Sequence, residues 1–273
     1  MTYCVGMMLD AGLVLMSDTR TNSGVDNIST FRKMFSWNVP GERIITLMTA
    51  GNLATTQAVV TQLEERNKVP GDRHPSILEA PTMFQVAGEV GRLLRQVVEG
   101  PGALAEPGSG AKAEGPRFTA SIIVAGQIRG MTPRLFLIYP EGNFIEATFD
   151  TPFFQIGETK YGRPILLRGY DRTMPFEDAV KLLMVSFDST LAANLSVGLP
   201  LDLMVIARDR FTPLHHRRIG ADDTYFRSIS KGWGDALRRA FHSLPSYDLG
   251  TPMPLEQQVD EVEAAIPEIL NQA

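Results

Sequence analysis

Thr2 is the residue near the start of the chain whose type and place best suit chemistry, because it follows the initiator methionine. A small second residue is typical of chains from which that methionine is removed, and removal leaves Thr2 at the N-terminus. An N-terminal threonine carries a hydroxyl nucleophile and an α-amine whose pKa is ~7.7–8.0. One residue then supplies both the nucleophile and the base that accepts its proton. Threonine is also common after methionine, so this feature is informative only together with others.

A predicted β-hairpin brings a carboxylate and a guanidinium toward Thr2. Residues 2–9 and 13–18 are short apolar runs typical of buried strands, and a turn signal separates them. A turn centred between these runs places Thr2 opposite Arg20 and diagonal to Asp18, with the three side chains on one face. The alternative is an ion pair at the strand end, which contributes little to stability when it is exposed.

Lys33 opens the next apolar strand, which we expect over residues 33–37 and paired with residues 43–49. A buried lysine needs a partner because an unpaired buried charge is costly, and Asp18 is the partner we expect. An ammonium beside the Thr2 hydroxyl would lower the hydroxyl pKa and shuttle its proton. The alternative is a lysine whose ammonium reaches water at the strand end.

Composition limits the class of protein. The chain has 273 residues, 44% of them hydrophobic, and a net charge of −5. No basic cluster indicates nucleic-acid binding, and no apolar run indicates a signal peptide or a membrane span. The lone cysteine, Cys4, cannot form a disulfide within the chain, which fits the reducing cytoplasm that we expect as the location.

Strands and helices are expected in separate runs, which favours an α+β domain with antiparallel sheets. Further strands are expected at residues 118–125, 134–139, 144–148, 153–156 and 201–208. Helices are expected at residues 53–67, 78–99, 159–167, 175–195 and 222–241. We expect one domain over residues 1–249, interrupted by a mobile Gly- and Pro-rich loop at 100–117. All the net negative charge lies in an acidic tail at 250–273.

Four segments together resemble a proteasome β-type subunit, a family of N-terminal nucleophile hydrolases. The greatest similarity is to Anbu, the bacterial ancestral β-subunit relative of the proteasome. The segments are TYCVG at 2–6, DTRTNSGVD at 18–26, STFRKM at 29–34 and TAGN at 49–52. The expected order of elements agrees with that family to about residue 208.

The resemblance implies roles for five residues. Thr2 matches the family's nucleophile, Asp18 and Lys33 match its carboxylate–lysine pair, and Arg20 matches the arginine of its Asp-x-Arg motif. Gly51 matches the glycine whose backbone N–H forms the oxyanion hole, and a glycine lets the backbone approach a substrate closely. The alternative for Gly51 is a simple strand-to-helix turn with Asn52 as the N-cap.

The chain departs from the family pattern at two places. Glu158 occupies the position of a serine beside the nucleophile, where it either raises the pKa of the Thr2 amine or acts as a proton acceptor. The family's later Asp-x-x-Ser-Gly motif has two rival counterparts, Ser196 within residues 194–198 and the pair Asp188-Ser189. Both are also ordinary polar residues for a helix end.

The resemblance implies an αββα four-layer sandwich and a threonine peptidase that needs no metal or organic cofactor. It also implies a homo-oligomer, as a ring or an open helical turn, acting on peptides or unfolded proteins. The acidic tail suits an inter-subunit helix, and it suits packing on its own domain equally well. Two other functions stay open: a weak or vestigial assembly module, and an amidase with the same nucleophile. The sequence does not name an ATPase partner.

Other candidates favour structural roles. His215 and His216 are adjacent and followed by two arginines, which indicates a strand edge rather than a metal site. Cys4 lies in an apolar run, which favours a buried thiol over a nucleophile. The basic residues of the helix expected at 222–241 indicate a solvent-facing side, which would also suit the acidic tail of a neighbouring chain.

Overall fold

The computed structural model describes residues 2–22, 28–69, 75–100 and 118–250 of the chain. Residues 101–117 of the expected loop and residues 251–273 of the acidic tail lie outside the described residues. By its internal contacts the chain divides into two compact units, Met1–Lys231 and Gly232–Ala273. The domain boundary expected at residue 249 stays a prediction. In the described part of the chain, no helix is long and apolar enough to cross a membrane.

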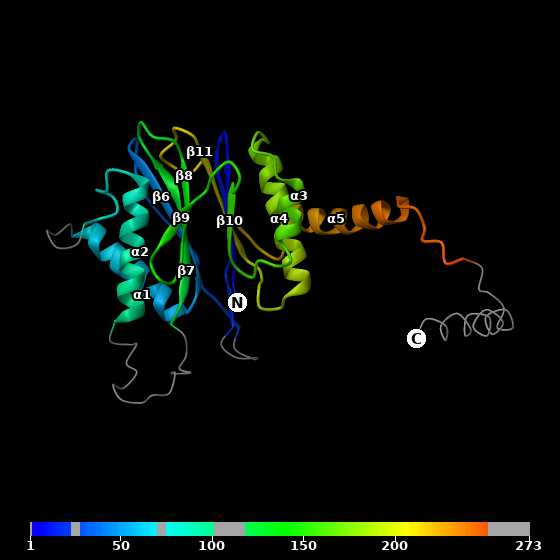
Figure 1. The fold of residues 1–273 in the computed structure, drawn as a ribbon, viewed down its shortest axis with the longest axis horizontal. Coiled ribbons are helices and arrows are strands. Elements are labelled where there is room, and N and C mark those ends of the chain that lie inside the picture. The colour runs from blue at the N-terminus through cyan, green and yellow to red at the C-terminus, as the bar shows by residue number, and fades with distance from the viewer. Residues whose placement is uncertain (1, 23–27, 70–74, 101–117, 251–273) are drawn as a thin grey trace, which may run out of the picture. The chain divides into compact units, whose positions relative to one another are not determined.

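Two five-stranded antiparallel sheets form the centre of the first unit (Figure 1). One sheet has the order β10-β1-β2-β11-β12, with bounds Phe153–Gly157, Tyr3–Leu9, Gly12–Asp18, Leu201–Ala207 and His215–Ile219. The other has the order β5-β6-β7-β8-β9, with bounds Met34–Val39, Arg43–Gly51, Ala120–Ile128, Arg134–Ile138 and Phe144–Glu146. A small third sheet pairs β3 (Arg20–Asn22) with β4 (Ile28–Thr30).

Helices cover the outer faces of both large sheets. Helices α1 (Leu53–Lys68) and α2 (Met83–Glu99) lie on the sheet that contains β6, and α3 (Arg163–Gly169) and α4 (Phe176–Ala193) lie on the sheet that contains β1 (Figure 1). A third apolar cluster, which includes Leu15, Met48 and Ile123, fills the space between the sheets. These four layers confirm the expected αββα sandwich.

Strands β1 and β2 are apolar at almost every position because both faces of their sheet are covered. Tyr3 and Val5 point into the cluster under α4, while Cys4 and Leu15 point into the cluster between the sheets. A strand that is buried on both faces reads as a continuous apolar run, which is the pattern seen in the sequence.

The expected hairpin register is wrong by one residue. Cys4 pairs with Ser17 and Leu9 with Gly12, so Thr2 does not lie opposite Arg20. The turn consists of two residues only, and Gly12 already belongs to β2 with φ +147°. A Cβ at that position would lie 2.1 Å from the Ile206 carbonyl oxygen, so only glycine admits the neighbouring strand this close.

Prolines account for two helix boundaries that differ from expectation. Helix α2 begins at Met83, with Thr82 as its N-cap, rather than at residue 78. The residue before Pro81 is disfavoured in the helical region, which prevents an earlier start. Helix α3 likewise begins at Arg163, with a proline in its first turn, rather than at residue 159.

Strands β3 and β4 were not expected at all.

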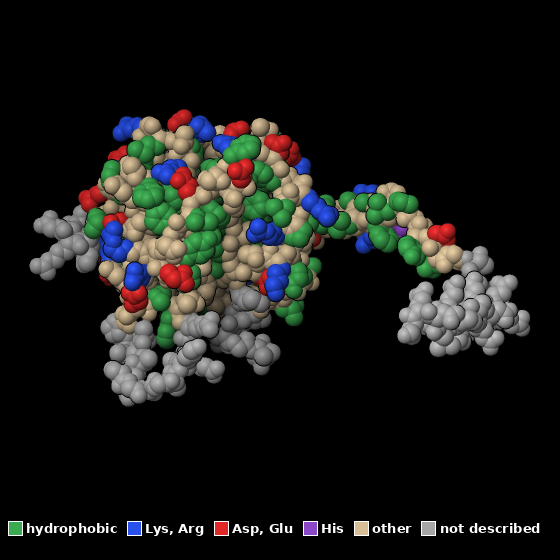
Figure 2. Space-filling view, viewed as in Figure 1, with side chains coloured by type: hydrophobic (Ala, Val, Ile, Leu, Met, Phe, Trp, Pro, Cys, Tyr) green, Lys and Arg blue, Asp and Glu red, His purple; other side chains and the backbone are tan. Residues whose placement is uncertain are grey.

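Helix α5 (Thr224–Ser243) begins in the first unit and continues into the second. Its expected basic side chains are present, and so are several exposed apolar ones toward its C-terminal end (Figure 2). They include Leu237 and Phe241, and Leu244 directly after the helix is exposed as well. On the face of the first unit that is seen in Figure 2, acidic and basic side chains are interspersed.

Two glycines in α2 provide a matched test of the packing between this helix and the β8–β9 turn. A Cβ at Gly88 has its nearest neighbour at 4.0 Å, whereas one at Gly91 would lie 2.2 Å from the Gly142 carbonyl oxygen. We expect Gly88→Ala to raise the free energy of unfolding by about 0.5–1 kcal/mol through helix propensity. Gly91→Ala should lower it because the backbone must shift. Urea denaturation of both variants measures this, and a stabilised Gly91→Ala would contradict the packing.

Candidate active site

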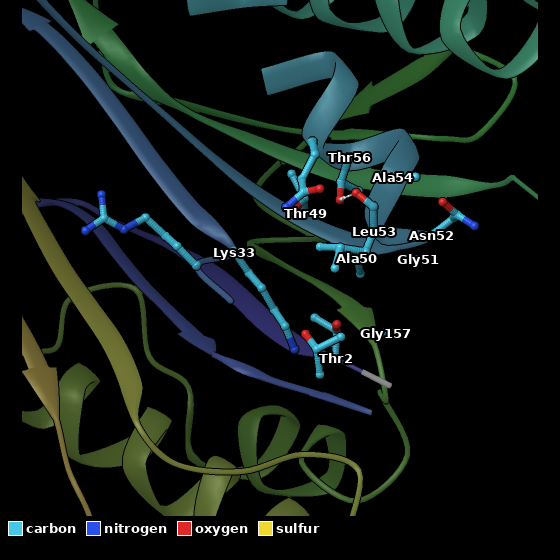
Figure 3. Close-up of a pocket in the computed structure, with 13 residues that line it drawn as sticks. Thr2, Lys33, Thr49, Ala50, Gly51, Asn52, Leu53, Ala54, Thr56 and Gly157 are labelled. Atoms are coloured by element: carbon cyan, nitrogen blue, oxygen red, sulfur yellow. Dashed lines mark hydrogen bonds between the residues drawn. The ribbon is translucent and has the colours of Figure 1, made fainter. Parts of the chain in front are cut away.

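A cavity of about 720 Å³ opens at the N-terminal end of β1, where the two sheets meet the start of α1 (Figure 3). It contains three of the residues singled out in the sequence: Thr2, Lys33 and Gly51. The other lining residues are Thr21, Arg32, Thr49, Ala50, Asn52, Leu53, Ala54, Thr56, Gln57 and Gly157. Among the described residues that line the cavity, none is acidic.

Thr2 is held against β10 by its backbone. The Thr2 carbonyl oxygen accepts a hydrogen bond from the Glu158 N–H at 2.7 Å, and Thr2 is 8% exposed. Gly157, with φ +85°, lies so close that a Cβ there would be 1.9 Å from the Thr2 carbonyl oxygen. The strand that precedes Glu158 must therefore end in glycine for Thr2 to occupy this position.

Asp18 and Lys33 form a buried ion pair behind Thr2. The Lys33 ammonium donates to Asp18 Oδ1 at 2.7 Å, with side-chain exposures of 6% and 0%. The Tyr3 N–H donates to Oδ1 at 3.0 Å and the Gly198 N–H donates to Oδ2 at 3.3 Å. Burial raises the pKa of Asp18, and Lys33 and the two backbone donors oppose that rise.

The Lys33 ammonium also donates to the Arg20 carbonyl oxygen at 2.6 Å, and Figure 3 shows the end of its side chain directed toward Thr2. The expectation that Asp18 partners a buried Lys33 is confirmed, and the alternative of a solvent-reaching ammonium is wrong. Thr2 and Lys33 thus meet at the cavity wall, with Asp18 behind the lysine.

Arg20 acts on a different part of the structure from the one expected. Its guanidinium donates from Nη1 to the Leu195 carbonyl oxygen at 3.0 Å. A Cβ on Gly198 would lie 2.1 Å from Arg20 Nε, so the guanidinium rests on the backbone of residues 195–198. Arg20 does not line the cavity; it supports the segment that follows α4.

Gly51 ends β6 at the cavity, with φ +114°. Asn52 caps α1, because its Oδ1 accepts a hydrogen bond from the Thr55 N–H at 3.1 Å. The strand-to-helix turn is therefore confirmed. The expected role of the Gly51 N–H toward an oxyanion is compatible with this turn and stays a prediction.

Glu158 and Ser196 are not among the described residues that line the cavity. Glu158 is 8% exposed, and its Oε2 accepts a hydrogen bond from Asn194 Nδ2 at 2.9 Å. Ser196 donates its backbone N–H to Asn194 Oδ1 at 2.9 Å. The rival pair, Asp188 and Ser189, belongs to α4 and is not among the described residues that line the cavity.

Two backbone contributions to the site were not expected from the sequence. Gly157 permits the approach to Thr2, and the Gly198 N–H reaches Asp18. Gly157 directly precedes Glu158, and Gly198 ends the segment that contains Ser196; only the polar side chains of these two segments were expected to matter. A glycine directly before or after such a polar segment was the available signal.

Cys4 and the two histidines have the structural roles that were expected. Cys4 is fully buried, and burial raises the pKa of its thiol. The thiol donates a hydrogen bond to the Thr49 carbonyl oxygen at 3.8 Å. His215 and His216 are exposed on the edge strand β12. Within the described ranges, no group of three or more His, Cys, Asp or Glu side chains could hold a metal ion.

Cys4 allows a direct test of the buried N-terminal strand because it is the only cysteine. A buried thiol with a raised pKa supplies almost no thiolate at pH 8, so we expect no alkylation by iodoacetamide in the native protein. Unfolding in guanidinium should make it fully reactive within minutes. Mass spectrometry measures the adduct, and rapid native alkylation would contradict the placement of β1.

Similarity to known proteins identifies the family of this chain. No family model matches it, and no curated protein matches it. Solved structures match over nearly the whole chain. An Anbu (Gly-1) mutant from Hyphomicrobium sp. strain MC1 is 47% identical, covers 91% of this chain and 100% of its own, and has a TM-score of 0.82.

Two further solved structures agree with this match. Anbu, the ancestral β-subunit, from Yersinia bercovieri is 44% identical over 92% of this chain and 100% of its own, with a TM-score of 0.82. The helical assembly of the Anbu complex from Pseudomonas aeruginosa is 43% identical over 91% of this chain and 99% of its own, also with a TM-score of 0.82. The chain therefore belongs to the Anbu family, the ancestral relatives of the proteasome β-subunit.

Proposed function

We propose that this protein is an N-terminal threonine peptidase that hydrolyses peptide bonds through an acyl-enzyme on Thr2. The observation that carries the proposal is the meeting of Thr2 and the Asp18-paired Lys33 at one cavity of about 720 Å³. Removal of Met1 would free the Thr2 amine. The proteasome-related fold of the family supports a hydrolase of this kind.

In the first step, the Thr2 hydroxyl attacks the scissile carbonyl carbon and its proton passes to the Thr2 amine. The positive charge of Lys33 beside the hydroxyl stabilises the developing alkoxide. The Gly51 N–H donates to the oxyanion that forms as the carbonyl carbon becomes tetrahedral.

In the second step, the carbon–nitrogen bond breaks and the amine returns its proton to the leaving group. A water molecule, deprotonated by the same amine, then attacks the ester carbon and releases the acyl product from Thr2 Oγ. The proton returns to the hydroxyl, so the enzyme ends each cycle unchanged.

Asp18 contributes by holding the Lys33 ammonium in place. Its carboxylate accepts from Lys33 and from two backbone N–H groups, which fixes its own orientation. A fixed ammonium needs little reorganisation when the charge on the Thr2 oxygen develops.

We further propose that the protein works as a homo-oligomer on peptides or unfolded proteins in the cytoplasm. The helical assembly of the Pseudomonas aeruginosa relative supports a ring or an open helical turn. Thr21, Thr49 and Leu53 line the cavity and would contact the substrate side chain.

A β-lactone that acylates N-terminal threonines tests the nucleophile. Intact mass should show that Met1 is absent and that wild type gains one adduct, which Thr2→Ala lacks. Thr2→Ser should retain labelling because it keeps both a hydroxyl and an amine. Thr61→Ala, which changes an exposed threonine of α1 that is not among the described residues lining the cavity, serves as the control and should label normally.

Two results would oppose this proposal. Absence of labelling in a chain that has lost Met1 would favour an assembly module without catalysis. Labelling without cleavage of any peptide in a library would favour an amidase.

Lys33→Met should slow the acylation of Thr2 by roughly 10²-fold or more, because no positive charge then stabilises the alkoxide that develops on Thr2. The wild-type rate should rise with pH through the amine pKa of ~7.7–8.0, since only the neutral amine accepts a proton. Adduct formation followed by mass spectrometry from pH 6 to pH 9 measures both effects. A rate that is independent of pH would exclude the amine as the base.

A further inference from the structure

Glu158 is a buried carboxylate for which the proposed mechanism has no step. Its backbone N–H is bonded to the Thr2 carbonyl oxygen at 2.7 Å, which places it directly beside the cavity. Its Oε1 accepts from the Lys160 N–H at 3.3 Å and its Oε2 accepts from Asn194 Nδ2 at 2.9 Å. Each oxygen therefore has a donor from the protein itself.

Asn194 connects this carboxylate to the end of α4. Its amide nitrogen can only donate and its amide oxygen can only accept, so its two contacts fix which way the amide points. Nδ2 donates to Glu158, while Oδ1 accepts from the Ser196 N–H at 2.9 Å. The backbone carbonyl oxygen of Asn194 also accepts a hydrogen bond from the Val197 N–H at 3.2 Å. Asn194 thus shapes the turn 194–198.

The turn 194–198 contacts Asp18 directly and contacts Lys33 indirectly, through Arg20. The Gly198 N–H donates to Asp18 Oδ2 at 3.3 Å, and the Leu195 carbonyl oxygen accepts from Arg20 Nη1 at 3.0 Å. The Arg20 carbonyl oxygen in turn accepts from Lys33. A continuous series of contacts runs from Glu158 through Asn194 to Asp18 and Lys33.

We propose that Glu158 is a positioning residue, which through Asn194 fixes the turn 194–198 and so orients Asp18 and Lys33 toward Thr2. The proposal deepens the proposed function and rests on it for its kinetic consequence. It differs from the role of proton acceptor that the sequence suggested, because Glu158 is not among the described residues that line the cavity and its carboxylate instead accepts from the Lys160 N–H and Asn194 Nδ2. In the positioning role, the contact matters and the charge does not.

An exchange of the two side-chain types separates contact from charge. In Glu158→Gln/Asn194→Asp, the glutamine amide donates to the aspartate, its oxygen accepts from the Lys160 N–H, and the aspartate still accepts from the Ser196 N–H. Every contact is retained with the carboxylate on the other partner. Asn194→Asp alone places two carboxylates, those of residues 158 and 194, against each other, and they repel. Asn194→Ala or Glu158→Ala removes the contact between the two side chains.

The first measurement is hydrogen–deuterium exchange of a peptide that covers residues 194–199 in the full chain. We expect roughly tenfold faster exchange in Glu158→Ala, Asn194→Ala and Asn194→Asp, and near wild-type exchange in the double exchange variant. Glu146→Gln, which removes a carboxylate from the Arg134 pair on β9, is the matched control and should leave this peptide unchanged.

The second measurement is the rate of Thr2 acylation by the β-lactone. The three single variants should each lose roughly tenfold, the pair Glu158→Ala/Asn194→Ala should lose no more than either alone, and the exchange variant should recover most of the rate. If Asn194→Ala keeps the wild-type rate while the exchange variant loses it, the carboxylate of Glu158 matters and its contact with Asn194 does not. That result would identify Glu158 as a proton acceptor and overturn the positioning role.

The two measurements keep this inference separate from the proposed function. Unchanged exchange in Glu158→Ala overturns the positioning role, whether or not Thr2 is reactive. Absence of labelling in the wild type overturns the proposed function alone, and the exchange measurement still decides whether Glu158 orders the turn 194–198.

Discussion

Lys33 and Asp18 are 2.7 Å apart and almost fully removed from water. Asp18 ends β2 in one sheet, whereas Lys33 directly precedes β5 in the other, so their contact joins the two halves of the sandwich. Removal of one partner of such a pair typically costs about 3–5 kcal/mol, because the remaining charge stays buried. The packing of the sheets and the arrangement around Thr2 therefore depend on the same interaction.

Backbone groups make this arrangement possible as much as side chains do. Gly157 lets Thr2 lie against β10, and Gly198 lets the Arg20 guanidinium rest on the turn after α4. A side chain at either glycine would meet a heavy atom at about 2 Å, well inside van der Waals contact. The strand end at Gly157 lines the cavity directly, whereas the turn after α4 supports Asp18 through the Gly198 N–H. A nucleophile at such a place loses little freedom when a substrate binds.

Glu158 belongs to a hydrogen-bonded network next to Thr2 and is not among the described residues that line the cavity. Glu158 Oε2 accepts a hydrogen bond from Asn194 Nδ2, while the Glu158 backbone N–H donates to the Thr2 carbonyl oxygen. Asn194, the C-cap residue of α4, supplies the donor for this carboxylate. This network connects the backbone beside Thr2 to the turn that follows α4.

The order of strands and helices, the apolar faces and the residue types of Thr2, Asp18 and Lys33 could be predicted from the sequence, because they follow from local periodicity and from motifs. The hairpin register could not, since a two-residue turn and a three-residue turn differ by one position and only packing against Ile206 selects between them. The partner of Glu158 was also beyond the sequence. Asn194 lies 36 positions away along the chain, and only the packing of α4 against β1 and β10 brings the two side chains together.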